Sequence, residues 1–396
     1  MTGLLHRINP RLPSLRPLKH QCIKSNSSLI SLRCDIDGSL PVLLNSPEED
    51  TTSLINGRLL LDVNSAAVEV KDLNITLRVH ITHKRPFKKG CKSCQRYTLE
   101  SKAHRAVTTS AILQRGTHGF PFIFEVGSYV PPSTNNSLIA VTYELHADAC
   151  IVPEGQPRTI PHIYTYKREI PVARTISVPT SPTYSRRIFK SAGSEIACRY
   201  NPVINLPGTN KVSLTLSGLL GYPEHGEVIH VWKLLKGSWW LEENIRTKAV
   251  ACGRYSLTKV EKSCQGGRDR TKTNILGEGG IYDGWDQTAN TDTIDLDFEY
   301  SIKKSKPYSA SYNPESSDMG ETALSVSHSL VIELVLIKED YPKDGSASAT
   351  RTGIARILRS KQDIFIGDYT RPSVLRQEEE LPCYDGTTMG PPDYNE

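Results

Sequence analysis

Hydrophobic residues recur at every second position in several parts of this chain, and this alternation constrains the fold more than any other feature. Between Leu73 and Thr82 the odd-numbered positions are apolar, while the even-numbered positions are polar or charged. The segment 293–300 alternates in the same way, with Asp295, Asp297 and Glu299 between apolar residues. A period of two sends successive side chains to opposite faces, so each segment predicts an antiparallel strand with one buried face and one wet face.

Similar strand patterns occur along most of the chain and are separated by turns rich in Gly, Pro and Asn. They cover Phe120–Phe124, Leu138–His146, Val212–Leu216, Glu227–Lys233 and Ser329–Lys338. No stretch before Tyr341 shows a convincing 3.6-residue amphipathic period. Short strands joined by turns are typical of sandwiches, so we expect an all-β fold of two tandem antiparallel β-sandwich domains.

The domain limits follow from where the alternation fades. Between about Glu154 and Lys190 Pro, Ser, Thr and Arg accumulate, and after Tyr341 the chain becomes polar. We therefore predict a basic N-terminal segment (1–25), a first sandwich (26–165), a connection (166–190), a second sandwich (191–345) and a flexible tail (346–396). Within that tail, Ile354–Leu358 is compatible with a basic amphipathic turn or helix, or with a loosely ordered linker.

Size, charge and cysteine content narrow the class of protein. A chain of 396 residues is long enough for two domains and a tail. The net charge of +5 is small for this length, so nucleic-acid binding is not expected. There is no apolar run of about 18 residues and no secretory signal, and the nine cysteines therefore suggest reduced thiols. We expect a soluble cytoplasmic protein.

Two short motifs near the C-terminus indicate a partner. They read Leu381-Pro382-Cys383-Tyr384 and Pro391-Pro392-Asp393-Tyr394. Consecutive prolines favour the polyproline II conformation, which the aromatic grooves of WW domains bind, and the tyrosine supplies a second anchor. A shuffled chain of this composition would contain only about 0.07 Pro-Pro-x-Tyr matches. The predicted WW-domain-binding residues are Leu381, Pro382, Tyr384, Pro391, Pro392 and Tyr394.

Several longer segments resemble the alpha-arrestins, the arrestin-related trafficking adaptors, and in particular a fungal subgroup. The segments 120–125 and 139–145 look like the late part of an arrestin N-terminal domain, and 231–243 and 326–334 fit its second domain. Cys91-Lys-Ser-Cys94 after a basic stretch is similar to what the fungal subgroup carries. The likeness covers most of the chain through diffuse patterns, and the terminal tyrosine motifs agree with it.

This resemblance implies a cytosolic adaptor with an arrestin-like fold. Such an adaptor recruits a WW-domain-containing HECT ubiquitin ligase to the cytosolic tails of plasma-membrane transporters, which are then ubiquitinated and endocytosed. The adaptor itself often receives ubiquitin, and recruitment to the plasma membrane, endosomes or Golgi is implied. An alternative within the same fold is a scaffold in receptor signalling, such as the arrestin-like component of fungal ambient-pH sensing.

A basic stretch provides a candidate surface for cargo tails or for anionic membrane lipids. Its residues are Lys84, Arg85, Lys88, Lys89, Lys92 and Arg96. Exposed positive charge steers such encounters, although a solvated loop between strands is the alternative interpretation.

No metal site is predicted from the sequence. Cys91 and Cys94 have the spacing of zinc ligands. However, strand alternation sends His80 to the wet face and gives His83 the opposite parity, and no second Cys-x-x-Cys motif is present. No cofactor is predicted either, because the glycine-rich run Gly277–Gly280 lacks a surrounding βαβ unit and indicates a flexible loop. Without a recognisable catalytic motif, we expect no enzyme.

Overall fold

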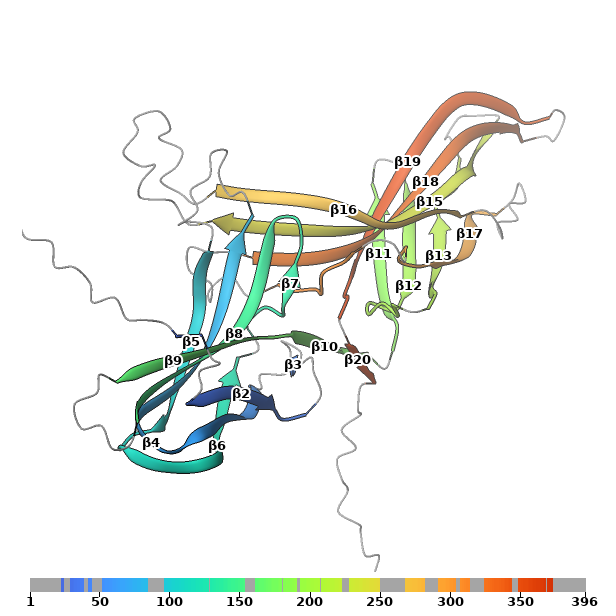
Figure 1. Cartoon of the computed structure of the whole chain (residues 1–396). Coiled ribbons are helices and arrows are strands. Elements are labelled where there is room, and N and C mark those ends of the chain that lie inside the picture. Colours follow the sequence, from blue (N-terminus) through green and yellow to red (C-terminus); the bar gives the residue numbers. More distant parts are fainter. Residues whose placement is uncertain are drawn as a thin grey trace, which may run out of the picture.

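The computed structural model describes residues 23–24, 29–38, 42–44, 52–84, 96–127, 129–153, 161–179, 181–190, 193–206, 208–222, 228–249, 268–281, 291–303, 307–313, 324–343, 348–367 and 369–372. These ranges hold twenty strands and no helix, which confirms the all-β prediction (Figure 1). Among the described residues there is accordingly no helix long and apolar enough to cross a membrane.

The N-terminal half is built around one eight-stranded sheet with the order β1-β9-β8-β4-β2, to which β5 and β6 add by pairing with β4, and β7 by pairing with β8. Its strands are β1 (Ile23–Lys24), β2 (Ile30–Ile36), β4 (Ser53–His83), β5 (Arg96–Val107), β6 (Ala111–Val126), β7 (Thr134–Asn135), β8 (Ile139–Pro153) and β9 (His162–Ile170).

The 31-residue strand β4 explains how this sheet forms a sandwich. Its first part pairs with β2 and β6, and its second part pairs with β5 and β8. The β4–β6 ladder is interrupted between Val63 and Ala67. Both parts of β4 bury alternate apolar residues, such as Leu59 and Ile75, in a single core. Alternation therefore works as the sequence predicted, with one apolar face turned toward that core.

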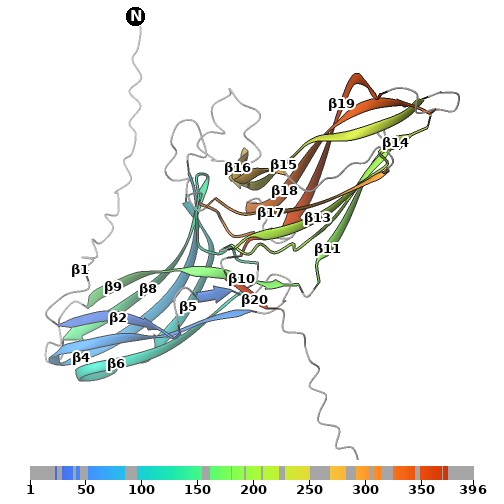
Figure 2. The same ribbon diagram turned by 90° about the vertical axis from the view of Figure 1, so that its right-hand side faces the viewer.

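The C-terminal half is a sandwich of a four-stranded and a five-stranded sheet, which share a second core (Figure 2). The first sheet contains β11 (Thr183–Phe189), β12 (Ser194–Tyr200), β13 (Asn210–Ser217) and β17 (Thr293–Tyr300). The second sheet contains β14 (Leu220–Gly221), β15 (Val228–Ala249), β16 (Arg268–Ile281), β18 (Leu324–Pro342) and β19 (Thr350–Ile364).

A small parallel sheet joins distant parts of the chain between the two halves. Strand β10 (Val172–Val178) pairs with β3 (Val42–Leu44) and with β20 (Tyr369–Pro372). The last described residues are thus fixed against the segment that connects the halves.

Three local predictions are wrong. The predicted tail contains β19, so Ile354–Leu358 is part of a strand rather than a helix or a linker. Part of the predicted connection, 166–190, forms strands β9, β10 and β11. The run Gly277–Gly280 lies in β16, where Gly279 faces Trp239, and a Cβ at position 279 would lie 2.9 Å from the indole. Glycine is therefore needed here for close packing and not for loop flexibility.

Candidate functional site

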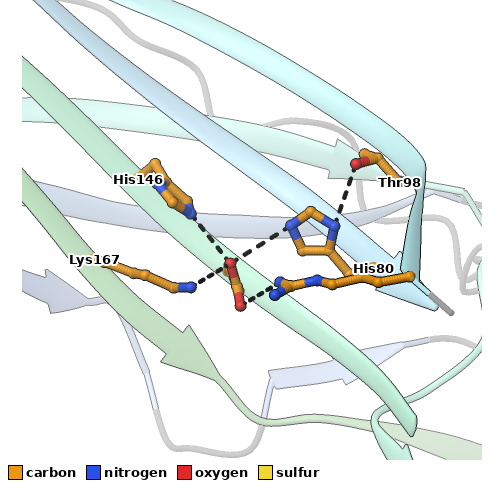
Figure 3. A network of polar contacts seen from close by, with 6 residues as sticks. His80, Thr98, His146 and Lys167 are labelled. Atoms are coloured by element: carbon orange, nitrogen blue, oxygen red, sulfur yellow. Dashed lines mark hydrogen bonds and ion pairs between the residues drawn. The ribbon is translucent and has the colours of Figure 1, made fainter. Parts of the chain in front are cut away.

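Glu144 is the centre of a polar network on the face of β8 that points away from the core. Its neighbours Tyr143 and Leu145 are fully buried in the core, so alternation places Glu144 on the opposite face. Side chains from β4, β5 and β9 nevertheless cover it, and it is only 7% exposed. Figure 3 shows His80, His146 and Lys167 pointing toward one carboxylate.

Four cationic or imidazole groups contact the Glu144 carboxylate. Arg96 Nη2 lies 2.6 Å away, Lys167 Nζ 2.9 Å and His146 Nε2 3.1 Å. His80 Nε2 is 3.5 Å away. Burial alone would raise the pKa of Glu144, but the hydrogen bonds from Lys167, His146 and Arg96 outweigh it and lower the pKa to about 2. The network therefore holds a carboxylate that stays ionised at neutral pH.

His80 corrects one expectation from the sequence. It lies on the polar face as alternation predicts, but that face is not wet here, because His80 is only 9% exposed. Its Nδ1 lies 3.2 Å from the hydroxyl of Thr98 on β5. Burial, and then the nearby charge of Arg96, lower the pKa of His80. A neutral imidazole at this position helps to pack the network.

The predicted basic stretch falls only partly within the described residues. Lys84 bonds to the side-chain oxygen of Asn135 at 2.5 Å and also donates to the carbonyl of Asn136, while Arg96 is bound to Glu144. Both described members are thus held by the N-terminal half itself. The other four lie outside the described residues: Arg85, Lys88, Lys89 and Lys92. A cargo-binding or lipid-binding role of the stretch stays a prediction.

The hairpin of β15 and β16 brings further cations to the same end of the N-terminal half. The guanidinium of Arg270 donates to the carbonyl of Lys84 at 2.6 Å, and Lys272 Nζ lies 2.8 Å from Ser137 Oγ. We call this contact region between the two halves the junction. Sequence reasoning missed Arg270 and Lys272, since nothing in their local pattern shows that β16 reaches the first domain.

A second buried carboxylate, Glu243 on β15, organises the junction further along the same strands. It is 1% exposed and accepts hydrogen bonds from the backbone N–H of Ser309 and the amide of Asn274, each at 2.7 Å. His328 Nε2 lies 3.8 Å from it. Burial would raise the pKa of Glu243, but the contacts with His328, Asn274 and Ser309 lower it. The amide of Asn136 in turn reaches Ser309 Oγ at 3.3 Å, which links this cluster to the first half.

Apolar and aromatic contacts complete the junction. Ile245 of β15 and Val326 of β18 belong to the core of the N-terminal half. Tyr312, between β17 and β18, donates its hydroxyl proton to the carbonyl of Tyr129. The fully buried guanidinium of Arg174 lies 5.7 Å from the centre of the Tyr312 ring. The two halves therefore pack against each other at the junction through apolar, aromatic and hydrogen-bonding contacts.

The remaining predicted site residues are not placed by the structure. Leu381, Pro382, Tyr384, Pro391, Pro392 and Tyr394 lie outside the described residues, as do Cys91 and Cys94. The described residues that precede the tyrosine motifs are those of β20, which ends at Pro372 against β10. Within the described ranges no group of three or more His, Cys, Asp or Glu residues is arranged to hold a metal ion.

Comparisons with known proteins agree with the fold. Residues 73–258 match a family model described as Arrestin_N terminal like, LDB19. An uncharacterized protein of Schizosaccharomyces pombe is 23% identical over 90% of this chain and 86% of its own length. A second uncharacterized protein of that yeast is 24% identical over 96% of this chain and 99% of its own length. Protein LDB19 of Saccharomyces cerevisiae is 24% identical over 52% of this chain and 27% of its own length.

Proposed function

We propose that this chain, which matches an arrestin-like family model over residues 73–258, is an arrestin-related adaptor that recruits a WW-domain-containing HECT ubiquitin ligase to plasma-membrane transporters. The ligase would ubiquitinate the transporter and promote its endocytosis. The chain would act as a scaffold that brings two proteins together, with no catalytic step of its own. It would work in the cytoplasm and be recruited to the plasma membrane, endosomes or Golgi.

The pair of tyrosine motifs carries this proposal. Each combines a proline that favours polyproline II with a tyrosine two positions later, as WW grooves require. The motifs follow β20, so the ligase would be tethered near the segment that connects the two halves. From Pro372 to Tyr394 the chain spans at most about 75 Å when fully extended, since each residue adds about 3.4 Å. This short tether would keep a bound ligase close to whatever the arrestin-like body holds.

Binding of cargo is assigned to the cationic end of the junction. Lys84 and Arg96 from the first half and Arg270 and Lys272 from the second lie there, and the rest of the basic stretch follows Lys84 in the sequence. Positive charge drawn from both halves suits acidic segments of transporter tails and anionic lipid headgroups, and would speed their encounter.

The proposal is tested by capture of the ligase's WW domains with the purified full chain. We expect Tyr384→Ala combined with Tyr394→Ala to abolish capture, because each change removes the aromatic anchor of its motif. The matched control replaces the variable positions of the same motifs, Cys383→Ala and Asp393→Ala, and should bind like the wild type. Undiminished capture by the double tyrosine variant would refute the proposal.

The cargo side needs a separate experiment, because the same fold also serves receptor signalling. Proximity labelling in living cells, with the wild-type chain and with the double tyrosine variant, would reveal the neighbouring membrane proteins. Labelling of many transporters agrees with a trafficking adaptor. One dominant receptor, with no transporters, would contradict the role in endocytosis.

A further inference from the structure

The outer face of the sheet formed by β2, β6 and the first part of β4 carries exposed apolar side chains. Leu54 is 50% exposed and Ile123 is 61% exposed. The two are diagonal neighbours in the β4–β6 ladder, where Leu54 pairs with Glu125 and Ile123 pairs with Asn56. Pro121, two residues before Ile123 and on the same face, is exposed as well. Leu54, Pro121 and Ile123 therefore form one exposed apolar patch, a feature that marks interaction sites on soluble proteins.

The patch belongs neither to the core nor to the junction. Alternation sends Ile55 and Phe122 to the opposite face, where both are buried in the core of the N-terminal half. Strand β6 lies at the border of that half and away from the C-terminal sandwich in both views (Figures 1 and 2). A partner on the patch would therefore not compete with the contacts between the two halves.

Two charges of opposite sign flank the patch. Arg58 lies opposite Pro121 in the β4–β6 ladder, and Glu125 lies opposite Leu54. Both are exposed, and neither side chain has a hydrogen bond or an ion pair with any other described residue. Steps of two residues along a strand are about 7 Å long and neighbouring strands are about 4.8 Å apart, so Arg58 and Glu125 lie about 14 Å from each other on the face. Each is thus available to a charge on a partner.

The charge of the whole face narrows the class of partner. In the segments 31–35, 54–62 and 117–125 the charged residues that point outward are Arg33, Arg58, Asp35, Asp62 and Glu125. Arg33 and Asp62 already pair at 3.2 Å. An anionic membrane or an acidic peptide selects a cationic surface, which this face is not. A partner with both signs of charge beside apolar residues fits it better, and a second copy of the chain has that composition.

Two-fold symmetry makes the face complementary to itself. A two-fold axis that lies between two such faces and passes beside Ile123 places Arg58 of each copy opposite Glu125 of the other copy. The same axis places Ile123 against its own counterpart, with Leu54 and Pro121 around it. The charges that lack a described partner within one chain then form two ion pairs around an apolar centre.

We propose that this face is the interface of a homodimer, with Ile123 at the two-fold axis and Arg58 paired with Glu125 of the other copy. The segment 54–62 of β4 and the width of three strands give the face about 30 Å by 15 Å, so two copies together bury on the order of 1,000 Å². Interfaces of this size are at the low end for specific complexes, so we expect a dimer that forms at micromolar concentration and dissociates on dilution.

Dimerisation goes beyond the proposed recruitment of a ligase and does not depend on it. A dimer would carry four tyrosine motifs instead of two, which would raise its avidity for a ligase with several WW domains. The test measures the mass of the purified chain and is therefore independent of ligase binding.

Sedimentation velocity of the purified full chain, from low to high micromolar concentration, measures that mass. We expect the wild type to approach twice the 44.0 kDa of one chain as the concentration rises. Ile123→Asp should weaken dimerisation at least about tenfold, because it would bury two unpaired carboxylates side by side at the axis. The matched control is Ile112→Asp, which changes an isoleucine of similar exposure, 59%, on the same strand but far from the patch. This control should dimerise like the wild type.

Charge reversal tests the pairing across the axis without altering the apolar centre. Arg58→Glu and Glu125→Arg should each weaken the dimer, since either change places like charges opposite each other twice. The combined variant restores both pairs with exchanged signs and should recover wild-type dimerisation. Such recovery cannot arise from a variant that fails to fold, and far-UV circular dichroism of each single variant reports its strands.

A wild-type chain that keeps the mass of one chain at the highest concentration, or an Ile123→Asp variant that dimerises like the wild type, would overturn the proposal. So would a combined charge variant that stays as weak as the single reversals. A monomeric wild type that binds vesicles of anionic lipid, with binding lost in Ile123→Asp but not in Ile112→Asp, would assign the face to a membrane instead.

Discussion

Replacement of Glu144 by glutamine tests whether the network on β8 stabilises the fold through charge. The variant keeps the size of the side chain and its ability to accept a hydrogen bond, but it removes the negative charge that Arg96, Lys167 and His146 share. A pKa of about 2 instead of 4.5 corresponds to at most about 3.4 kcal/mol, because one pKa unit is about 1.36 kcal/mol. Arg96 and Lys167 are 44% and 51% exposed, so solvent screens part of this energy. We therefore expect Glu144→Gln to lower the free energy of unfolding by about 1 to 2 kcal/mol at neutral pH.

The pH dependence gives the sharper test. The folded-state pKa of Glu144 lies below the unfolded value of 4.5, so its contribution is complete above pH 4.5 and is lost as the pH falls toward 2. The difference between wild type and variant should fall to roughly 40% of its neutral value at about pH 3. Urea unfolding followed by far-UV circular dichroism at several pH values measures that difference.

A matched control is Glu299→Gln on β17. Glu299 also pairs with a lysine, but at 3.6 Å and with side chains that are 53% and 82% exposed. We expect this change to stay within about 0.5 kcal/mol of the wild type. If Glu144→Gln behaves like the control, or if its deficit grows as the pH falls, the electrostatic account of the network is refuted.

Two further substitutions and one reactivity measurement test packing and burial. Gly279→Val should lower the free energy of unfolding by about 2 to 3 kcal/mol in thermal or urea unfolding, because its Cβ would lie 2.9 Å from the Trp239 ring; unchanged stability would contradict that contact. Tyr312→Phe removes a hydrogen bond across the junction and should cost about 1 kcal/mol, and a neutral result would show that this bond contributes nothing. Burial raises the pKa of Cys34 to about 11 and of Cys198 to about 12, so neither thiol should react with a thiol reagent in the folded chain at about pH 8, and rapid reaction of both would refute their burial.

Sequence alternation predicted strand faces correctly where one face is wet and the other is apolar. In β17 the residues Ile294, Leu296 and Phe298 are buried, while Asp295 and Asp297 between them are exposed. The alternation is visible in the sequence there because each side chain of β17 faces either the core or the solvent. The same reasoning identified the strands that became β4, β6, β8, β13, β15 and β18.

Alternation failed where the buried positions are not apolar. In the second part of β19 the buried series includes Ser360 and Gln362, which bond to each other at 2.8 Å. Because these buried side chains are polar, the hydrophobicity pattern of this segment does not show the period of two. In β16 the glycines replace side chains that the Trp239 ring would exclude. The glycines of β16 are acceptable because of Trp239 on the partner strand β15, which the local sequence of β16 does not show.

The sequence did not predict the polar network around Glu144, for a related reason. Alternation puts Glu144 and His80 on the polar face, but only the registers of β5 and β8 against β4, and of β9 against β8, bring Arg96 and Lys167 to the same carboxylate. Registers between strands far apart in the sequence depend on the whole sheet, so a local pattern cannot supply them. The tyrosine motifs could be recognised because a docking segment is read from consecutive residues.

Strands β15 and β18 each contribute to both cores, and this opposes separation of the two halves. Leu241 and Leu334 pack in the core of the C-terminal half, whereas Ile245 and Val326, on the same two strands, pack in the core of the N-terminal half. Separating the halves would expose the ends of both strands and break the hydrogen bonds that Arg270 donates to the carbonyl of Lys84 and that Tyr312 donates to the carbonyl of Tyr129. Exposure of apolar ends and loss of these hydrogen bonds both oppose separation. The cations Lys84, Arg270 and Lys272 therefore lie at one end of a body whose two halves are packed together.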